Sequence, residues 1–232
     1  MINIVFCGYR QWAHDTFEKI SAHPRINIKH FVHSKEAFTE LFSSICPDDI
    51  DVVVLLGWSW FVKTEILTNF QCVGIHPSDL PSFRGGSPIQ NQIIGGISKT
   101  KASLMSLSPD KMDEGDIWLK EDLDLTGDSI GEIFINLVDC STLLLTGFFD
   151  EYPGLSPETQ NLEDGSYFKR RLPGDSKLLP TDFTSRSAKE LYNFMRCLTD
   201  PYPNAYLEDR DGNRLVFTSV KYIAKEFIDD IV

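Results

Sequence analysis

The sequence has no long apolar run and no segment typical of membrane targeting. Its longest continuous apolar run, at residues 52–58, is far shorter than the roughly 18 apolar residues that a membrane-spanning helix needs. The first residues, Met1 to Phe6, have no basic segment before them and no small-residue cleavage site after them, so we expect a strand there and not a signal peptide. We therefore expect a cytoplasmic protein that makes no membrane contact.

Basic residues are scarce relative to acidic ones. The chain of 232 residues has 22 Lys and Arg against 34 Asp and Glu, which gives a net charge of −12. A surface with this average charge repels the phosphate backbone of nucleic acids. We therefore expect small-molecule substrates and no nucleic-acid partner.

Cysteines are few, and no two of them form a Cys-x-x-Cys pair. This absence excludes the common zinc and redox motifs, and no cluster of His and Cys has a recognised ligand spacing, so we expect no metal. An odd number of widely spaced cysteines in apolar surroundings is typical of buried free thiols in a reducing cytoplasm. The five are Cys7, Cys46, Cys72, Cys140 and Cys197.

The first half of the chain alternates strand-like and helix-like segments. Short apolar runs predict strands, and polar stretches with helical spacing of apolar residues predict helices between them. This order is typical of an α/β fold with a mostly parallel, Rossmann-like sheet. The expected strands are 2–7, 26–32, 51–56, 72–75, 103–107 and 116–123, and the expected helices are 16–21, 35–42 after a Ser34 cap, 63–70 and 127–149.

A stretch rich in Pro, Gly and charge, residues 153–180, has no clear periodicity and indicates a domain boundary. We expect one domain at residues 1–177 and a small C-terminal domain at residues 178–232. The latter combines a helix at 188–197 with a β-hairpin around Asp211-Gly212.

The densest signal for chemistry is the segment from Gly74 to Pro88. It delivers His76 from a strand end into a loop stiffened by prolines, and the pair Gly85-Gly86 allows backbone to approach a ligand closely. Ligands of parallel sheets lie beyond the carboxyl ends of the strands, where Gly8 and Trp58 also fall. Gly8 has no companion glycines of the dinucleotide fingerprint, which argues against a dinucleotide oxidoreductase.

Two motifs in this sequence resemble those of the folate-dependent formyltransferases. The first is His-Pro-Ser-x-Leu-Pro-x-Phe-Arg-Gly-Gly-x-Pro at residues 76–88, and the second is Asp-Glu-Gly-Asp-Ile at residues 113–117. Residues 197–206 resemble a segment of the second domain of that family more weakly. The resemblance covers most of the chain, and the family includes the methionyl-tRNA, glycinamide ribonucleotide and sugar-nucleotide N-formyltransferases.

The resemblance implies a formyltransferase fold and the transfer of a formyl group from N10-formyltetrahydrofolate, as co-substrate, to a primary amine. It implies that His76 stabilises an oxyanion or moves a proton, and that Asp113 holds the imidazole and favours its charged form. The expected folate contacts are Trp60, Phe61, Val62, Arg84, Gly85, Gly86, Met112 and Asp116. The expected contacts to the amine substrate are Gly8, Trp58, Ser78, Gln90, Asn91 and Arg170.

One position departs from the family pattern. The family has Asn two residues before the His, and this chain has Gly74, which carries no side-chain donor. Loss of one oxyanion donor costs on the order of 3 kcal/mol in other enzymes. The sequence offers as replacements Gln90, Asn91, Ser78 or a backbone N–H of the Gly85-Gly86 turn, and it does not rank them.

The charge and the short segment after the predicted boundary argue against a tRNA substrate, so we expect a nucleotide-linked amino sugar of surface polysaccharide biosynthesis. Lys169, Arg170 and Arg171 are candidates for diphosphate contact. A homodimer is expected through the hairpin edge and Tyr202, Tyr206 and Phe217. Two alternatives stay open: a hydrolase of formyltetrahydrofolate, and a non-catalytic relative that binds folate or nucleotide, for which Gly74 argues. The sugar, its amine position and the nucleotide are not written in the sequence.

Overall fold

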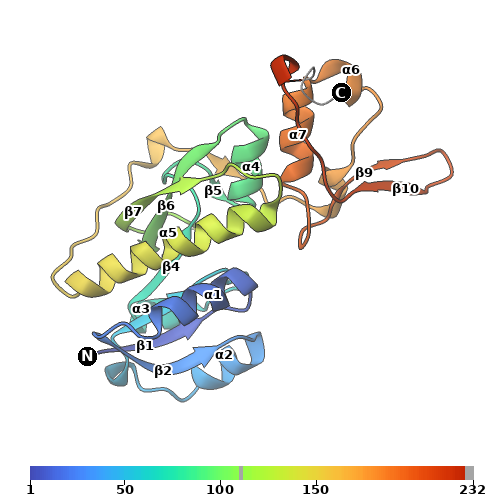
Figure 1. Ribbon diagram of the computed structural model, residues 1–232. Helices are drawn as coiled ribbons and strands as arrows, with labels where there is room; N and C mark the ends of the chain where they lie inside the picture. The colour runs from blue at the N-terminus through green and yellow to red at the C-terminus, as the bar shows by residue number, and fades with distance from the viewer. Residues whose placement is uncertain (110–111, 228–232) are drawn as a thin grey trace.

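A single six-stranded sheet forms the centre of the protein in a computed structural model that describes residues 1–109 and 112–227 (Figure 1). The strand order is β2-β1-β3-β4-β6-β7. The strands β2, β1, β3 and β4 pair in parallel, whereas β6 runs antiparallel to both of its neighbours, β4 and β7. Their bounds are β1 Ile2–Cys7, β2 Ile26–Val32, β3 Val52–Leu55, β4 Cys72–His76, β6 Lys99–Ser106 and β7 Ile117–Asp124. The predicted α/β fold with a mostly parallel sheet is confirmed.

Helices cover both faces of this sheet. Buried residues of α1, α4 and α5 pack on one face, and those of α2 and α3 pack on the other. Double coverage explains why all four residues of β3 are buried and apolar. The predicted Ser34 cap begins α2, where the Ser34 hydroxyl accepts a hydrogen bond from the N–H of Ala37. The bounds are α1 Gln11–Ile20, α2 Lys35–Leu41, α3 Thr64–Asn69, α4 Pro88–Ile94 and α5 Ile130–Glu151.

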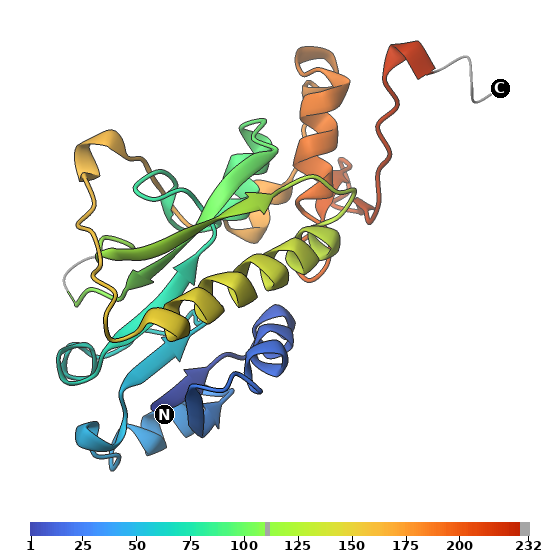
Figure 2. The same ribbon diagram turned by 60° about the vertical axis from the view of Figure 1, so that its left-hand side comes forward.

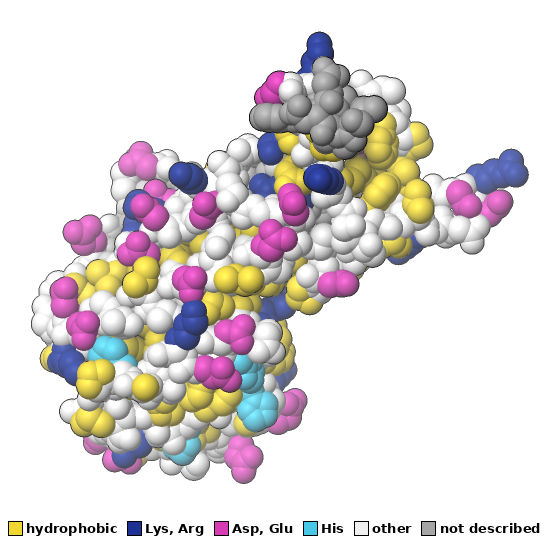
Figure 3. Space-filling model, in the orientation of Figure 1, with side chains coloured by type: hydrophobic (Ala, Val, Ile, Leu, Met, Phe, Trp, Pro, Cys, Tyr) yellow, Lys and Arg dark blue, Asp and Glu magenta, His cyan; other side chains and the backbone are white. Residues whose placement is uncertain are grey.

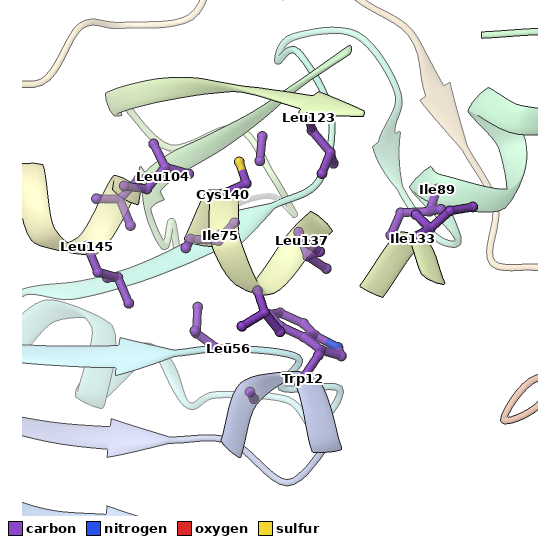
Figure 4. Packing of buried hydrophobic residues seen from close by; sticks show 14 of the residues in the cluster. Trp12, Leu56, Ile75, Ile89, Leu104, Leu123, Ile133, Leu137, Cys140 and Leu145 are labelled. Carbon is purple, nitrogen blue, oxygen red and sulfur yellow. The ribbon is translucent and has the colours of Figure 1, made fainter. Parts of the chain in front are cut away.

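The long helix α5 lies across β6 and β7 with α1 beside it (Figures 1 and 2). Figure 4 shows α5 residues such as Leu137 and Leu145 among Ile75 of β4 and Leu104 of β6. Among the described residues, α5 is the one helix long and apolar enough to cross a membrane by length and composition. Because half of its apolar window is buried against the sheet and α1, it is the core helix of a globular fold.

The C-terminal part consists of two helices and a hairpin that stand beside α4 (Figure 1). Its elements are α6 Asp182–Ser185, α7 Ala188–Arg196, β9 Ala205–Glu208 and β10 Arg214–Phe217. Met195, Cys197 and Ala205 belong to the same hydrophobic cluster as the buried face of α5. The division at residue 177 stays a prediction, and one continuous core takes residues from both sides of it.

Residues 153–180 are more than a linker. They contain the two-residue strand β8 Tyr167–Phe168, which pairs in parallel with β5 Arg84–Gly85. They also contain two of the four short 3-10 helical turns of the described chain. Such short strands leave no periodicity in a sequence, which is why the pattern predicted only a boundary. The turns are Pro47–Asp49, Leu162–Asp164, Pro173–Ser176 and Lys225–Phe227.

Two predictions about exposure need correction. Four of the five cysteines are buried free thiols as expected, but Cys46 is exposed, because it precedes a surface turn and not a strand. Tyr206 was expected at a dimer surface, yet it is buried against the core. The exposed apolar residues of the hairpin are instead Leu215 and Val216.

Candidate active site

His76 is the last residue of β4 and lies at the carboxyl edge of the parallel strands. His76 is 6% exposed, and both of its ring nitrogens face protein groups. Nε2 lies 2.8 Å from the carbonyl oxygen of Phe83, and Nδ1 lies 3.5 Å from Oδ2 of Asp113. The two residues that the resemblance implies as catalytic are therefore in contact.

The partners of the ring constrain its protons. A carbonyl oxygen only accepts, so Nε2 carries a hydrogen that it donates to Phe83. Nδ1 faces a carboxylate, which also only accepts. The imidazolium form has a hydrogen on each ring nitrogen and so offers a donor to both acceptors, and this assignment of the hydrogens follows from the partners. The arrangement therefore directs Nδ1 toward the Asp113 carboxylate and Nε2 toward the Phe83 carbonyl.

Asp113 links the histidine to the glycine turn. Its Oδ2 accepts a hydrogen bond of 2.8 Å from the N–H of Gly85. Its side chain is 14% exposed, and that of His76 is 8% exposed. Because water is largely excluded, the interaction of the two groups is stronger than it would be at the surface.

The loop after His76 is held by one of its own polar side chains and by one from α4. The Ser78 hydroxyl donates to the carbonyl of Ser82 at 2.7 Å, and the Gln92 amide donates to the carbonyl of Pro77 at 2.8 Å. Ser78 is fully buried. The hydroxyl that the sequence offers to a substrate is thus used inside the loop.

The glycine pair is explained by a close approach of chain. A Cβ on Gly85 would lie 2.3 Å from the carbonyl oxygen of Phe168, and one on Gly86 would lie 2.2 Å from Cα of Arg170. The N–H of Gly86 donates to the carbonyl of Phe168 at 2.8 Å. The rings of Phe83 and Phe168 stack, with centroids 5.0 Å apart. Segment 165–171 therefore packs against the loop that carries the motif and supports it. A folate contact by Gly85 and Gly86 stays a prediction.

The other residues expected at the folate differ in their surroundings. Arg84 is buried, and its guanidinium donates to the Glu114 carboxylate at 2.8 Å, so its charge is already paired. Met112 is exposed, and the backbone carbonyl of Asp116 accepts from the N–H of Ser106. Arg84 therefore holds the loop to Glu114, and a contact of Arg84 with the folate stays a prediction.

An aromatic group lies where β1 and β3 end. Tyr9 and Trp60 have ring centroids 4.3 Å apart, and Trp58 meets Trp60 edge-on at 4.8 Å. Phe61 is 85% exposed, whereas Val62 is buried in the core on the far face. Sequence reasoning missed Tyr9, although its place directly after Gly8 at the end of a strand was a usable signal. Gly8 itself is required by packing, since a Cβ there would lie 2.8 Å from Cβ of Ala13.

The position of the missing Asn is filled from a neighbouring strand end. A Cβ on Gly74 would lie 3.0 Å from Cδ1 of Leu107 and 3.1 Å from the carbonyl oxygen of Leu55. The side chain of Leu107 thus occupies space that a longer residue at position 74 would need. This relationship was not visible in the sequence.

The predicted replacements for the Asn donor are mostly engaged. The Asn91 amide donates to the carbonyl of Gly86 at 2.9 Å, and the hydroxyl of Ser78 and the N–H groups of Gly85 and Gly86 have the partners given above. Among the described residues, the buried amide nitrogen of Gln90 has no partner. Its role as the replacement donor stays a prediction.

The basic run differs from residue to residue. Lys169 and Arg170 are exposed, and the backbone of Arg170 lies against Gly86. Arg171 is partly buried, donates to the carbonyl of Asp175 and lies over the ring of Phe194. Arg170 is thus the residue of the run best placed to reach a ligand near the loop. Within residues 1–109 and 112–227, no group of three or more His, Cys, Asp or Glu is arranged to hold a metal ion.

The relatives found by sequence include methionyl-tRNA formyltransferases. The chain is 28% identical over 199 residues to the methionyl-tRNA formyltransferase of Ehrlichia canis, which covers 84% of this chain and 61% of that protein. It is 31% identical over 179 residues to that of Clostridioides difficile, covering 75% of this chain and 55% of the relative. The chain therefore spans little more than half the length of these relatives.

Solved structures with this fold carry several names. A methionyl-tRNA formyltransferase from Clostridium thermocellum superposes with a TM-score of 0.75 at 26% identity, over 96% of this chain and 100% of that one. A sugar N-formyltransferase from Shewanella gives the same TM-score at 14% identity, over 97% and 100% of the chains. HypX from Aquifex aeolicus, in complex with tetrahydrofolic acid, gives 0.64 at 16% identity over 88% and 35%.

The family profile described as "Formyl transferase" matches residues 8–133. This match covers more than half of the chain and includes the His76 loop and the Asp113 turn. The chain therefore belongs to the formyl transferase family.

Proposed function

We propose that this protein transfers a formyl group from N10-formyltetrahydrofolate to a primary amine. The observation that carries the proposal is the buried pair of His76 and Asp113, with Nδ1 and Oδ2 3.5 Å apart at the carboxyl edge of β4. Membership of the formyl transferase family supports it. The complex of HypX with tetrahydrofolic acid supports folate as the ligand of this fold.

The pair suits the proton balance of such a transfer. A new bond forms between the amine nitrogen and the formyl carbon, the bond from that carbon to the folate N10 breaks, and one proton passes from the amine to N10. His76 can give or take this proton at Nδ1, because Nε2 is held by the carbonyl of Phe83. Asp113 stabilises the charged ring while negative charge develops on the formyl oxygen.

As acceptor we propose the amine of a nucleotide-linked amino sugar. The net charge of −12 disfavours a polyanion as large as tRNA. Acidic side chains are spread over the face of the molecule seen in Figure 3. A nucleotide diphosphate needs only a few cations, and the exposed Arg170 beside Gly86 is the candidate to supply one.

The curated relatives favour a second acceptor, methionyl-tRNA. Their names give this activity, and identity to them reaches 31%. The two acceptors differ in how steeply their binding weakens with ionic strength: a tRNA loses many phosphate contacts, whereas a sugar nucleotide loses only those of its diphosphate.

Gly74 supports a further candidate, a hydrolase of formyltetrahydrofolate or a binding protein without turnover. Leu107 lies where the family's Asn side chain would project from position 74, so one donor to the oxyanion is missing. Water as acceptor would release formate in the absence of any amine. A binding protein would bind the folate and release nothing.

One experiment separates these candidates. The protein is incubated with N10-formyltetrahydrofolate and, in separate reactions, dTDP-, UDP- and GDP-linked amino sugars, methionyl-tRNA, or no acceptor, and products are read by mass. A formyl group on an amino sugar that depends on the folate supports the proposal. Formylated methionyl-tRNA, or formate release without acceptor, would replace it.

We also propose a cytoplasmic homodimer. The unpaired cysteines fit a reducing compartment, and Leu215 and Val216 leave apolar surface on the hairpin. Light scattering of the wild type and of Leu215→Lys tests the dimer, which the charged variant should weaken.

A further inference from the structure

The turn that carries Asp113 needs support from outside itself. Asp113 has a φ of 59°, a left-handed conformation that is uncommon in residues other than Gly, Asn and Asp. Two residues later, Gly115 packs so tightly on β6 that a Cβ would lie 1.8 Å from the carbonyl oxygen of Ser106. The turn is therefore pressed against the sheet in one particular conformation.

Gln160 holds this turn from the other side. Its side-chain nitrogen donates to the backbone carbonyl of Asp113 at 3.0 Å and to that of Gly115 at 2.6 Å. The residue is 8% exposed and comes from the loop after α5, 47 residues along the chain from Asp113. A single buried amide thus uses both of its hydrogens on the carbonyls of two residues of the turn, Asp113 and Gly115.

Gln160 is itself fixed by its neighbours in the loop. Glu158 and Ile117 exchange two backbone hydrogen bonds, each of 2.8 Å, at the start of β7. Beyond Gln160, the strand β8 pairs with β5 of the His76 loop. The loop is therefore attached to the Asp113 turn at one end and to the His76 loop at the other.

We propose that Gln160 is a positioning residue that sets the direction of the Asp113 carboxylate toward His76. Fixing the carbonyls of Asp113 and Gly115 fixes the peptide group next to the Cα of Asp113, and this restricts the direction in which the side chain of Asp113 leaves the backbone. Oδ2 must reach the N–H of Gly85 at 2.8 Å while it lies 3.5 Å from Nδ1 of His76. Because a displacement of about 1 Å in a catalytic group can cost roughly 100-fold in rate, this direction matters for turnover.

The chemistry of the amide supports a role beyond stability. The side-chain oxygen of Gln160 is buried and has no partner among the described residues. A buried polar atom without a partner is unfavourable and calls for a reason. The two hydrogen bonds from the side-chain nitrogen give that reason. Leu at position 160 would fill the space without an unpaired oxygen, but it would no longer hold the turn. Glu would direct its oxygens at the two carbonyls, which also only accept.

The test uses Gln160→Leu and the isosteric Gln160→Glu, so that a failure of one variant to fold does not end the experiment. Asn161→Ala is the matched control, because its amide lies in the same loop but donates to the exposed carboxylate of Asp164. Two measurements are made on folded protein: steady-state kinetics of formyl transfer, and the 15N chemical shifts of the His76 ring. Asp113→Asn provides the reference shifts for a histidine without its carboxylate.

We expect both Gln160 variants to lower kcat by about 10- to 100-fold, with KM for the folate within about twofold. Their His76 nitrogen shifts should move toward those of Asp113→Asn, whereas the control should match the wild type. Loss of thermal stability with unchanged kcat and unchanged His76 shifts would overturn the inference. The inference rests on the proposed function, but the shifts do not need turnover: a wild type without formyl transfer ends the proposed function, and unmoved shifts end the positioning role.

Discussion

The carbonyl oxygen of Phe83 accepts a hydrogen bond of 2.8 Å from Nε2 of His76, and Phe83 itself has a φ of 57°. This left-handed conformation costs on the order of 1 to 3 kcal/mol for a residue with a side chain. Contacts from β8 and from the residue before it offset the cost: the ring of Phe168 stacks on that of Phe83, and the Ser166 hydroxyl accepts a hydrogen bond of 2.9 Å from the N–H of Phe83. The orientation of the histidine therefore depends on a segment that begins with Ser166, 83 residues along the chain from Phe83.

The first prediction concerns His76. We expect His76→Ala to lower kcat by about 10² to 10⁴, the range for loss of a general acid or base, because the variant lacks the imidazole that holds the exchanging proton. The dissociation constant for the folate, measured by calorimetry, should change little. The exposed His33 provides the control, and His33→Ala should behave as the wild type. Turnover that survives His76→Ala would rule out a proton role for the imidazole.

The second prediction concerns Gly74 and Leu107. Gly74→Asn alone should lower the free energy of unfolding by about 1 to 3 kcal/mol, because its side chain meets Cδ1 of Leu107 at a position already 3.0 Å from Cβ. Combining it with Leu107→Ala should recover part of that loss. If the missing amide limits turnover, the double variant should raise kcat by up to about 100-fold.

Leu107→Ala alone is the control for the second prediction, since it removes the obstacle without supplying a donor. Urea denaturation measures stability, and formyl transfer measures kcat. A double variant as stable as the control but no faster would mean that the site does not need a donor at position 74.

Sequence patterns predicted the elements that are apolar and continuous. The strand 2–7 was placed at its observed bounds, because it is a nearly uninterrupted apolar run that is buried. The edge strand 26–32 was also placed at its observed bounds, although Lys29 and His30 at its centre are exposed. The contact of His76 with Asp113 was also expected, since the two motifs resemble one family. What decides these features is local composition or a recognisable string of residues.

The support of the site could not be predicted in the same way. Gln160 and Phe168 lie in a stretch with no periodicity, because β8 has two residues and the rest is loop. Gln160 lies 47 residues along the chain from its partner Asp113, and Phe168 lies 168 − 83 = 85 residues from its partner Phe83. Long-range contacts made by single side chains leave no pattern in one sequence, so the stretch was interpreted as a boundary.

The third prediction compares two glycines with positive φ. Gly85 has a φ of 90° and faces the carbonyl oxygen of Phe168 at 2.3 Å from an added Cβ, whereas Gly212 has a φ of 85° and open space around it. Ala at either position is strained by about 1 kcal/mol or more, and only Gly85→Ala also meets backbone. We expect Gly85→Ala to lower the free energy of unfolding by at least about 2 kcal/mol more than Gly212→Ala.

Turnover gives a second measurement for the same pair. Gly85→Ala should separate β5 from β8 and displace the N–H that Asp113 accepts, so kcat of the folded protein should fall. Gly212→Ala, in the distant hairpin turn, should leave kcat unchanged. Equal effects of the two substitutions on stability would show that β8 moves aside without cost and does not hold the loop.

The fourth prediction concerns Arg170, the exposed cation whose backbone lies against Gly86. If it contacts the diphosphate of the sugar nucleotide, Arg170→Ala should raise KM for that substrate by about tenfold and leave KM for the folate unchanged. Arg210→Ala is the matched control, since Arg210 is also exposed but lies in the hairpin turn.

Ionic strength distinguishes a direct contact from a general field effect. An exposed charge pair is screened by salt, so KM of the wild type should rise with added salt, and this dependence should be weaker in Arg170→Ala than in Arg210→Ala. If instead both variants lower the salt dependence equally, the substrate responds to the total charge of the protein, which is already −12, and not to Arg170. An unchanged KM in Arg170→Ala would place the diphosphate away from segment 165–171.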